Sequence, residues 1–101
     1  MNGDALRLLR IFNEYSATDL SEKLGISKSY LSEIENGKKQ PTLELIDKYA
    51  KVFNMRPSTL LLFAEAIEDD PECAAGNKQR VARASIKLLN ILDKVGDLSS
   101  E

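Results

Sequence analysis

The sequence contains no histidine and no tryptophan, and it has one cysteine, Cys73, among its 101 residues. Without histidine there is no imidazole general base, no histidine-based zinc site and no Ser-His-Asp or Cys-His pair. Because one thiol cannot close an internal disulfide, a reducing compartment is expected, and Cys73 is interpreted as incidental. The sequence has no Gly-rich phosphate loop, so it predicts neither an enzyme nor a metal or cofactor site.

Long apolar runs are also missing from the sequence. No segment approaches the roughly 20 apolar residues that cross a bilayer, and the first residues lack the basic, apolar and small-residue pattern of a signal peptide. We therefore expect a soluble, cytoplasmic protein. Only five glycines and three prolines interrupt a chain that is 43% hydrophobic, and this composition favours a small helical fold with a compact core.

The charge of the chain is nearly balanced, with a net value of -2. Residues 1–63 hold nine basic and eight acidic side chains, whereas residues 64–101 hold five basic and eight acidic ones. A protein that coats DNA without selectivity is more basic than this. Any surface for nucleic acid must therefore be a local patch in the first part of the chain, and Asp69 and Asp70 are interpreted as part of a solvated acidic segment.

Apolar periodicity and capping residues predict six helices, over residues 4–15, 17–24, 28–36, 43–53, 59–67 and 79–95. The expected caps are Ser16, Ser27, Thr42 and Ser58 at helix starts and Asn54 at the end of the fourth helix. The apolar face of the fourth helix is expected to hold Leu43, Ile46, Tyr49, Ala50 and Phe53. An acidic linker is expected over residues 68–78, with Pro71 and Gly76 inside it.

The second and third predicted helices meet at Gly25-Ile26-Ser27. A glycine there permits the positive φ that a tight turn requires. In the helix that follows, Leu31 and Ile34 face inward, which leaves small and polar side chains outward near its N-terminus. Readout of base edges in the major groove requires such side chains, and the positive end of the helix dipole favours phosphate. Residues 17–37 are therefore predicted to form a helix-turn-helix that binds DNA.

The segment from Leu20 to Pro41 resembles the Cro/cI-type (XRE-like) helix-turn-helix regulators, which include phage repressors and their bacterial relatives. Its most specific feature is Glu-Asn-Gly-Lys at residues 35–38, shortly before the proline. The resemblance covers residues 6–61 and implies an all-α, five-helix lambda-repressor-like bundle at residues 1–67. It also implies a homodimeric transcriptional regulator, usually a repressor, that binds a pseudo-palindromic operator in double-stranded DNA.

The resemblance further implies roles for individual residues. Arg10 is expected to form a structural ion pair with Glu35, which fixes the recognition helix on the scaffold. The residues expected to read bases are Ser27, Lys28, Ser29, Ser32 and Glu33, with the lysine donating to guanine and the glutamate accepting from cytosine. The residues expected to contact phosphate are Ser16, Tyr30, Asn36, Lys38, Lys39 and Thr42.

The sequence departs from the family pattern in the second predicted helix, residues 17–24, and in the turn before it. The first residue of that helix is Ala17, where related proteins usually carry a glutamine that contacts phosphate, and Ser21 replaces a usual alanine. Glu14 and Tyr15 occupy the turn in which the family has a glycine. One phosphate contact is therefore missing from the expected set, so binding is expected either to be weaker or to depend more on Ser16 and the lysines.

The last predicted helix, residues 79–98 with its tail, lies beyond the resemblance. Its apolar positions recur at alternating steps of three and four, which is heptad-like: Val81, Ala84, Leu88, Ile91, Val95 and Leu98. Three interpretations are open: this helix pairs with the same helix of a second subunit, folds back onto its own chain, or binds another protein. These heptad-like positions form an apolar seam. The role expected for the seam, together with Leu61 and Phe63, is dimerisation or packing. The third interpretation implies an alternative function, an antitoxin-like regulator with a protein partner.

Overall fold

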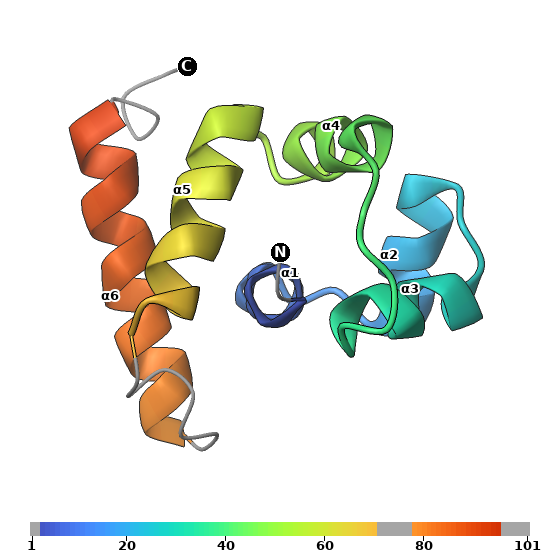
Figure 1. The fold of residues 1–101 in the computed structure, drawn as a ribbon, viewed down its shortest axis with the longest axis horizontal. Coiled ribbons are helices and arrows are strands. Elements are labelled where there is room, and N and C mark those ends of the chain that lie inside the picture. The colour runs from blue at the N-terminus through green and yellow to red at the C-terminus, as the bar shows by residue number, and fades with distance from the viewer. Residues whose placement is uncertain (1–2, 71–77, 96–101) are drawn as a thin grey trace.

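The computed structural model describes residues 3–70 and 78–95, without the side chains of 78–80 and 95, and it confirms the all-α prediction (Figure 1). The described part contains no strand and six helices: α1 (Asp4–Phe12), α2 (Ala17–Leu24), α3 (Lys28–Glu35), α4 (Leu43–Val52), α5 (Pro57–Glu68) and α6 (Lys78–Val95). In Figure 1, α1 lies centrally between α2 and α3 on one side and α5 and α6 on the other. Outside the described residues lie Cys73, the linker over 71–77, Leu98 and the side chain of Val95.

Short polar side chains begin three of the helices, as predicted. The hydroxyl oxygens of Ser16, Ser27 and Thr42 each accept the backbone N–H three residues ahead, at 3.0–3.1 Å. Each bond satisfies a donor that has no partner within its helix. Gly25 closes α2 with a left-handed φ of 73°, which glycine adopts without steric strain. The chain therefore turns sharply before α3, and this turn sets the angle between the two helices.

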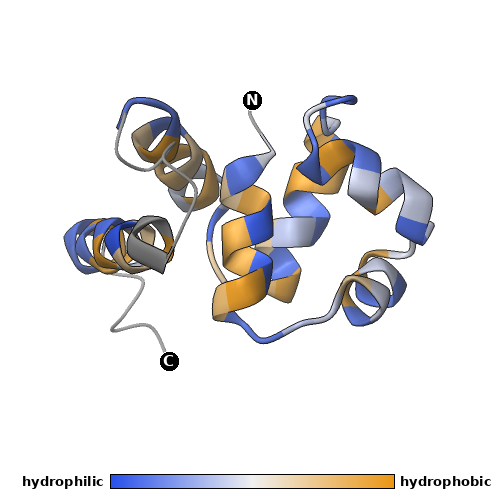
Figure 2. Ribbon diagram, turned by 90° about the horizontal axis from the view of Figure 1, so that it is seen from below, coloured by the Kyte–Doolittle hydropathy of each residue, from blue (hydrophilic) through white to orange (hydrophobic). Residues whose placement is uncertain are grey.

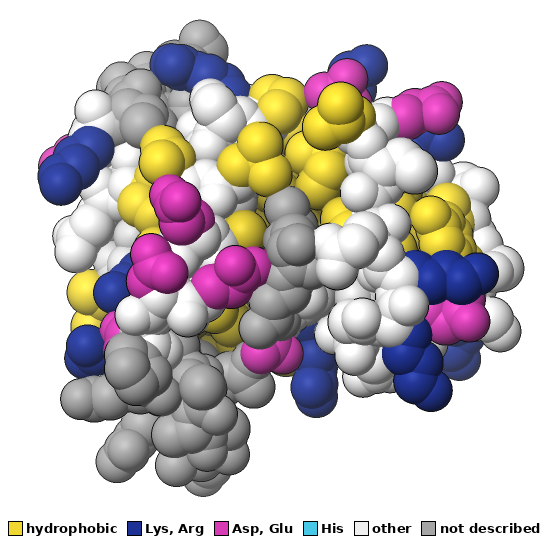
Figure 3. Space-filling model, in the orientation of Figure 1, with side chains coloured by type: hydrophobic (Ala, Val, Ile, Leu, Met, Phe, Trp, Pro, Cys, Tyr) yellow, Lys and Arg dark blue, Asp and Glu magenta, His cyan; other side chains and the backbone are white. Residues whose placement is uncertain are grey.

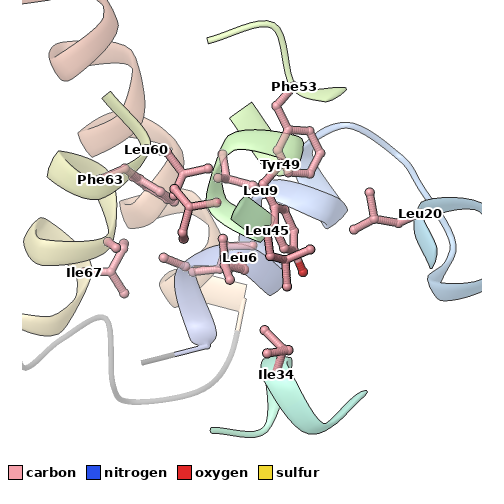
Figure 4. Packing of buried hydrophobic residues seen from close by; sticks show 14 of the residues in the cluster. Leu6, Leu9, Leu20, Ile34, Leu45, Tyr49, Phe53, Leu60, Phe63 and Ile67 are labelled. Atoms are coloured by element: carbon pink, nitrogen blue, oxygen red, sulfur yellow. The ribbon is translucent and has the colours of Figure 1, made fainter. Parts of the chain in front are cut away.

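The core gathers the apolar faces of the helices around α1. Leu6 and Leu9 of α1 are fully buried, and Figure 4 shows them at the centre of the labelled side chains. Leu20 of α2 and Ile34 of α3 are fully buried in the same cluster. Figure 2 shows that hydrophobic and hydrophilic residues alternate along these helices. Burial of each such side chain contributes about 1.5–3 kcal/mol, so the cluster holds α3 against α1.

Two predictions at helix starts were wrong. Ser58 does not cap α5, because the helix begins at Pro57 with Arg56 in the N-cap position. Proline suits the first helical position, since its φ is already helical and it lacks an N–H that would have no partner there. Leu43 was predicted on the apolar face of α4 but is 83% exposed, whereas Leu45 is buried. Helical side chains lean toward the N-terminus, so the first residue of α4 points past the helix end, away from the core.

Two helix ends also differ from the prediction. α1 stops at Phe12, and Glu14 follows with a left-handed φ of 59°. This conformation is disfavoured for a non-glycine residue by about 1–2 kcal/mol, so the packing of the helices on either side holds Glu14 in it. α4 ends at Val52, and Asn54, one residue beyond the cap, has a φ of 57°. Asparagine tolerates that conformation better than most residues.

α6 folds back on its own chain, which is one of the three arrangements considered for it. It packs along α5 and also contacts α1 (Figure 1). Ala84 is fully buried, and Val81, Leu88 and Ile91 lie partly buried against the core. Phe63 of α5 is fully buried as well, whereas Leu61 is exposed. Most of the described seam therefore serves packing within one chain.

A buried carboxylate fastens α6 to the end of α5. Asp70 was predicted to be solvated but is only 7% exposed. Its Oδ2 accepts a hydrogen bond from Nε of Arg83 at 2.6 Å and lies 3.1 Å from Nζ of Lys87. The two cations are four residues apart, one helical turn, and so face the same carboxylate. The prediction failed because the sequence did not show that this turn of α6 lies against the end of α5.

Asp70→Ala is expected to lower the free energy of unfolding by about 1–3 kcal/mol, because it removes charge-assisted hydrogen bonds at a buried position. Asp69→Ala is the matched control, since Asp69 is the neighbouring residue and is exposed. That control should change the free energy of unfolding by less than about 0.5 kcal/mol. Urea denaturation followed by circular dichroism measures both variants. Equal effects would contradict a fastening role for Asp70.

Candidate nucleic-acid interface

The residues expected to read bases lie along one side of α3 and at the turn before it. This readout strip consists of Ser27, Lys28, Ser29, Ser32 and Glu33, of which the first four are exposed and the glutamate is partly exposed. On the other side of the helix, Leu31 and Ile34 are buried in the core. α3 thus presents a polar side outward while its apolar side attaches it to the domain.

The start of α3 offers hydrogen-bond donors and a positive potential. Ser27 Oγ accepts the N–H of Tyr30 at 3.0 Å, which leaves the hydroxyl hydrogen available to an external acceptor. The first backbone N–H groups of a helix have no acceptor within it. The first turn of α3 contains no acidic residue, so no carboxylate there offsets the positive end of the helix dipole. This end of α3 therefore suits anionic or acceptor groups.

The residues expected to contact phosphate lie at the N-caps of α2 and α4, on α3 and at its end, and in the loop after α3. The exposed members are Ser16, Asn36, Lys38, Lys39 and Thr42, while Tyr30 is partly buried against the core. Asn36 Nδ2 donates to Ser32 Oγ at 3.2 Å. Lys39 Nζ lies 3.6 Å from Oε1 of Glu33 and 5.8 Å from the centroid of the Tyr30 ring. Figure 3 shows basic side chains gathered at the right-hand edge, over the region of α2 and α3, with acidic side chains beside them.

One guanidinium of α1 holds both ends of the helix-turn-helix. Arg10 donates from Nε to Oε2 of Glu35 at 2.9 Å and from Nη2 to Oε1 at 3.1 Å. Its Nη1 donates to the carbonyl oxygen of Tyr15, just before α2, at 3.2 Å. The Glu35 side chain is 8% exposed, and its hydrogen bond raises the pKa of the Arg10 guanidinium. A bidentate pair fixes orientation as well as distance, so Arg10 sets how α3 is presented.

Two further features at this attachment were not predicted from the sequence: the close approach of Gly3, and the place of Tyr49 beside the ion pair, although Tyr49 was expected on the apolar face of its helix. A Cβ on Gly3 would lie 2.1 Å from the carbonyl oxygen of Ile34, so this close approach of the chain to α3 requires glycine. Tyr49 is fully buried, and its hydroxyl has no hydrogen-bond partner among the described residues. Burial raises the pKa of the Tyr49 phenol, and the charge of Glu35 raises it further, so the ring stays neutral beside the pair. Both features depend on distances between elements, which no local pattern marks.

The departure at Ala17 also has a structural consequence. Ala17 is the first residue of α2 and lies partly buried against the core. Its methyl group offers no hydrogen-bond donor, whereas Ser16 carries a hydroxyl and the first backbone N–H groups of α2 have no acceptor within the helix. The described residues hold no group of three side chains suited to a metal ion. Among them, no helix combines the length and apolar character needed to span a membrane.

Arg10→Ala should lower the free energy of unfolding by about 2–4 kcal/mol, because it leaves a nearly buried carboxylate without its partner. Arg7→Ala is the control, since Arg7 lies on the same helix but is exposed; its expected effect is within about 0.5 kcal/mol. Chemical denaturation of the two variants beside the unmodified protein measures the difference. If both substitutions have the same small effect, Arg10 does not hold α3.

Comparison with known proteins gives matches to helix-turn-helix proteins. The helix-turn-helix family matches residues 6–60, from α1 into α5. The HTH-type transcriptional regulator SinR of Bacillus licheniformis is 35% identical over 71 residues, which cover 69% of this chain and 64% of SinR. An uncharacterized HTH-type transcriptional regulator of Methanocaldococcus jannaschii is 34% identical over 65 residues, or 64% of this chain and 92% of that protein. The match thus spans less than two thirds of the length of the SinR relative.

A solved structure also resembles this chain along its whole length. The structure is a SinR protein/SinI protein complex, and the comparison covers 100% of both chains with a TM-score of 0.56 and 24% identity. At this level of identity the likeness concerns the fold. It supports the all-α architecture found here.

Proposed function

The chain belongs to the XRE-type helix-turn-helix family, and we propose that it is a sequence-specific DNA-binding transcriptional regulator, not an enzyme. In this proposal it acts in the cytoplasm as a homodimeric repressor. One observation carries the proposal: α3 exposes a polar readout strip while its other side is buried and its end is tied to α1 by Arg10 and Glu35. In this proposal residues 1–67 form the DNA-binding domain, and residues 79–98 serve dimerisation or packing.

In the proposed complex, the N-terminal part of α3 enters the major groove. Lys28 donates to O6 and N7 of a guanine, and Glu33 accepts from N4 of a cytosine. Ser29 and Ser32 complete the contacts with base edges. Ser27 acts as a donor, because its oxygen already accepts the cap hydrogen bond.

The phosphate contacts position the domain without reading sequence. We assign them to Ser16, Tyr30, Asn36, Lys38, Lys39 and Thr42. Because the chain as a whole has a net charge of -2, this anchoring depends on local cations rather than on the total charge. Since Ala17 supplies no side-chain donor, the loop lysines carry more of the affinity.

Dimerisation is proposed to use the outward sides of α5 and α6. Four large apolar side chains there are between 42% and 59% exposed: Leu61, Leu62, Ile86 and Leu89. Phe63 and Ala84 are buried beneath them in the same chain, so they support this surface rather than contact the second subunit. A two-fold dimer reads two half-sites one DNA turn apart, which is the arrangement the homodimer proposal requires.

A second candidate function is that of an antitoxin-like regulator, in which the same exposed apolar side chains bind a different protein. Two observations favour it. α6 lies outside the residues that match the helix-turn-helix family. The solved structure of similar fold is itself a complex of two proteins.

Selection of the purified protein against random duplex DNA tests the proposal. We expect an enriched pseudo-palindrome whose half-site centres lie about 34–36 Å apart. The double variant Lys28→Ala, Glu33→Ala should lose this enrichment, whereas Lys51→Ala, at an exposed position near the end of α4, should keep it. Enrichment of a single half-site would contradict the homodimer alone. No enrichment at moderate salt would contradict DNA regulation and favour the protein-binding candidate.

A further inference from the structure

Lys39 and Lys38 are neighbours in the loop after α3, but their side chains have different surroundings. Lys39 Nζ lies 3.6 Å from Oε1 of Glu33 and 5.8 Å from the ring centroid of Tyr30. Lys38 forms no ion pair with any residue that the structure describes. Only one of the two loop lysines is therefore directed back over α3.

The backbone places Lys39 beside Glu33. The N–H groups of Lys38 and Lys39 both donate to the carbonyl oxygen of Glu33, at 2.9 and 3.2 Å. Tyr30 and Glu33 are three residues apart and so lie on the same face of α3. The Lys39 side chain therefore crosses this face and meets Glu33, which is the one acidic member of the readout strip.

A carboxylate close to DNA is repelled by the phosphates. An ammonium at 3.6 Å offsets that charge and restricts the directions in which the carboxylate can point. Because an ammonium has three donor hydrogens, Lys39 can hold Glu33 and a phosphate oxygen at the same time. We propose that Lys39 is a positioning residue that determines the base preference of Glu33. This inference rests on the proposed function, since it requires that Glu33 faces a base.

The ion pair is not explained by a contribution to stability. The side chains of Lys39 and Glu33 are 57% and 41% exposed, and ion pairs at such positions stabilise a fold little. Substitution of Lys39 therefore leaves the protein folded, so a change in base preference is not a consequence of unfolding. Methionine is the suitable replacement, because it keeps an unbranched apolar stem over Tyr30 and removes the charge.

The experiment measures relative affinities for every single-base variant of the enriched DNA site. Lys39→Met should change the preference by about three- to ten-fold at the position where Glu33→Gln also changes it. Lys38→Met, the matched control, should lower the affinity for all variants by the same factor. Lys39→Arg, which keeps the charge, should retain the preference of the unmodified protein.

A second comparison separates positioning from phosphate contact. In the Glu33→Gln background, Lys39→Met should cause only a uniform loss of affinity, because there is no carboxylate left to position. A uniform loss in the unmodified background as well would overturn the inference and leave DNA binding intact. The same holds if Glu33→Gln changes no base preference. If the unmodified protein enriches no sequence, the proposed function fails and the inference fails with it.

Discussion

The bidentate contact between Arg10 and Glu35 is the constraint on which the presentation of α3 depends. Leu31 and Ile34 hold the helix to the core by apolar burial, which is not directional and leaves the helix free to slide or turn by small amounts. The two hydrogen bonds at 2.9 and 3.1 Å remove that freedom, and the close approach of Gly3 to the end of α3 fixes the separation. Because the third hydrogen bond of Arg10 reaches the start of α2, one side chain aligns both helices of the motif.

The remaining structure separates two surfaces. α2 and α3 lie on one side of α1, and α5 and α6 lie on the other (Figure 1). The acidic end of α5 thereby lies on the other side of α1 from α3, and Asp70 is paired with Arg83 and Lys87. Within the strip, Lys39 offsets the single negative charge. Local placement of charge, rather than the net charge of -2, makes α3 compatible with a polyanion.

Local chemistry made part of this structure predictable from the sequence. The hydroxyl caps at Ser16, Ser27 and Thr42 were correctly predicted, although the one at Ser58 was not. These caps and the glycine turn at Gly25 depend on residues within three or four positions. Arg10 and Glu35 were linked only through the family resemblance, since periodicity does not say which helices meet. The burial of Asp70 and the close approach of Gly3 to α3 were not predicted, because the surroundings of both residues come from elements distant in sequence. The apolar seam of α6 showed which side is buried, but it did not show what covers that side.

Amide NMR shifts during titration with duplex DNA show whether DNA lies against the N-terminal part of α3. The predicted result is that the largest shifts occur from Ser27 to Glu33 and at Lys38 and Lys39, with small shifts throughout α5. Shifts concentrated on α5 and α6, with α3 unchanged, would contradict this placement and show that the chain meets its partner through the opposite side.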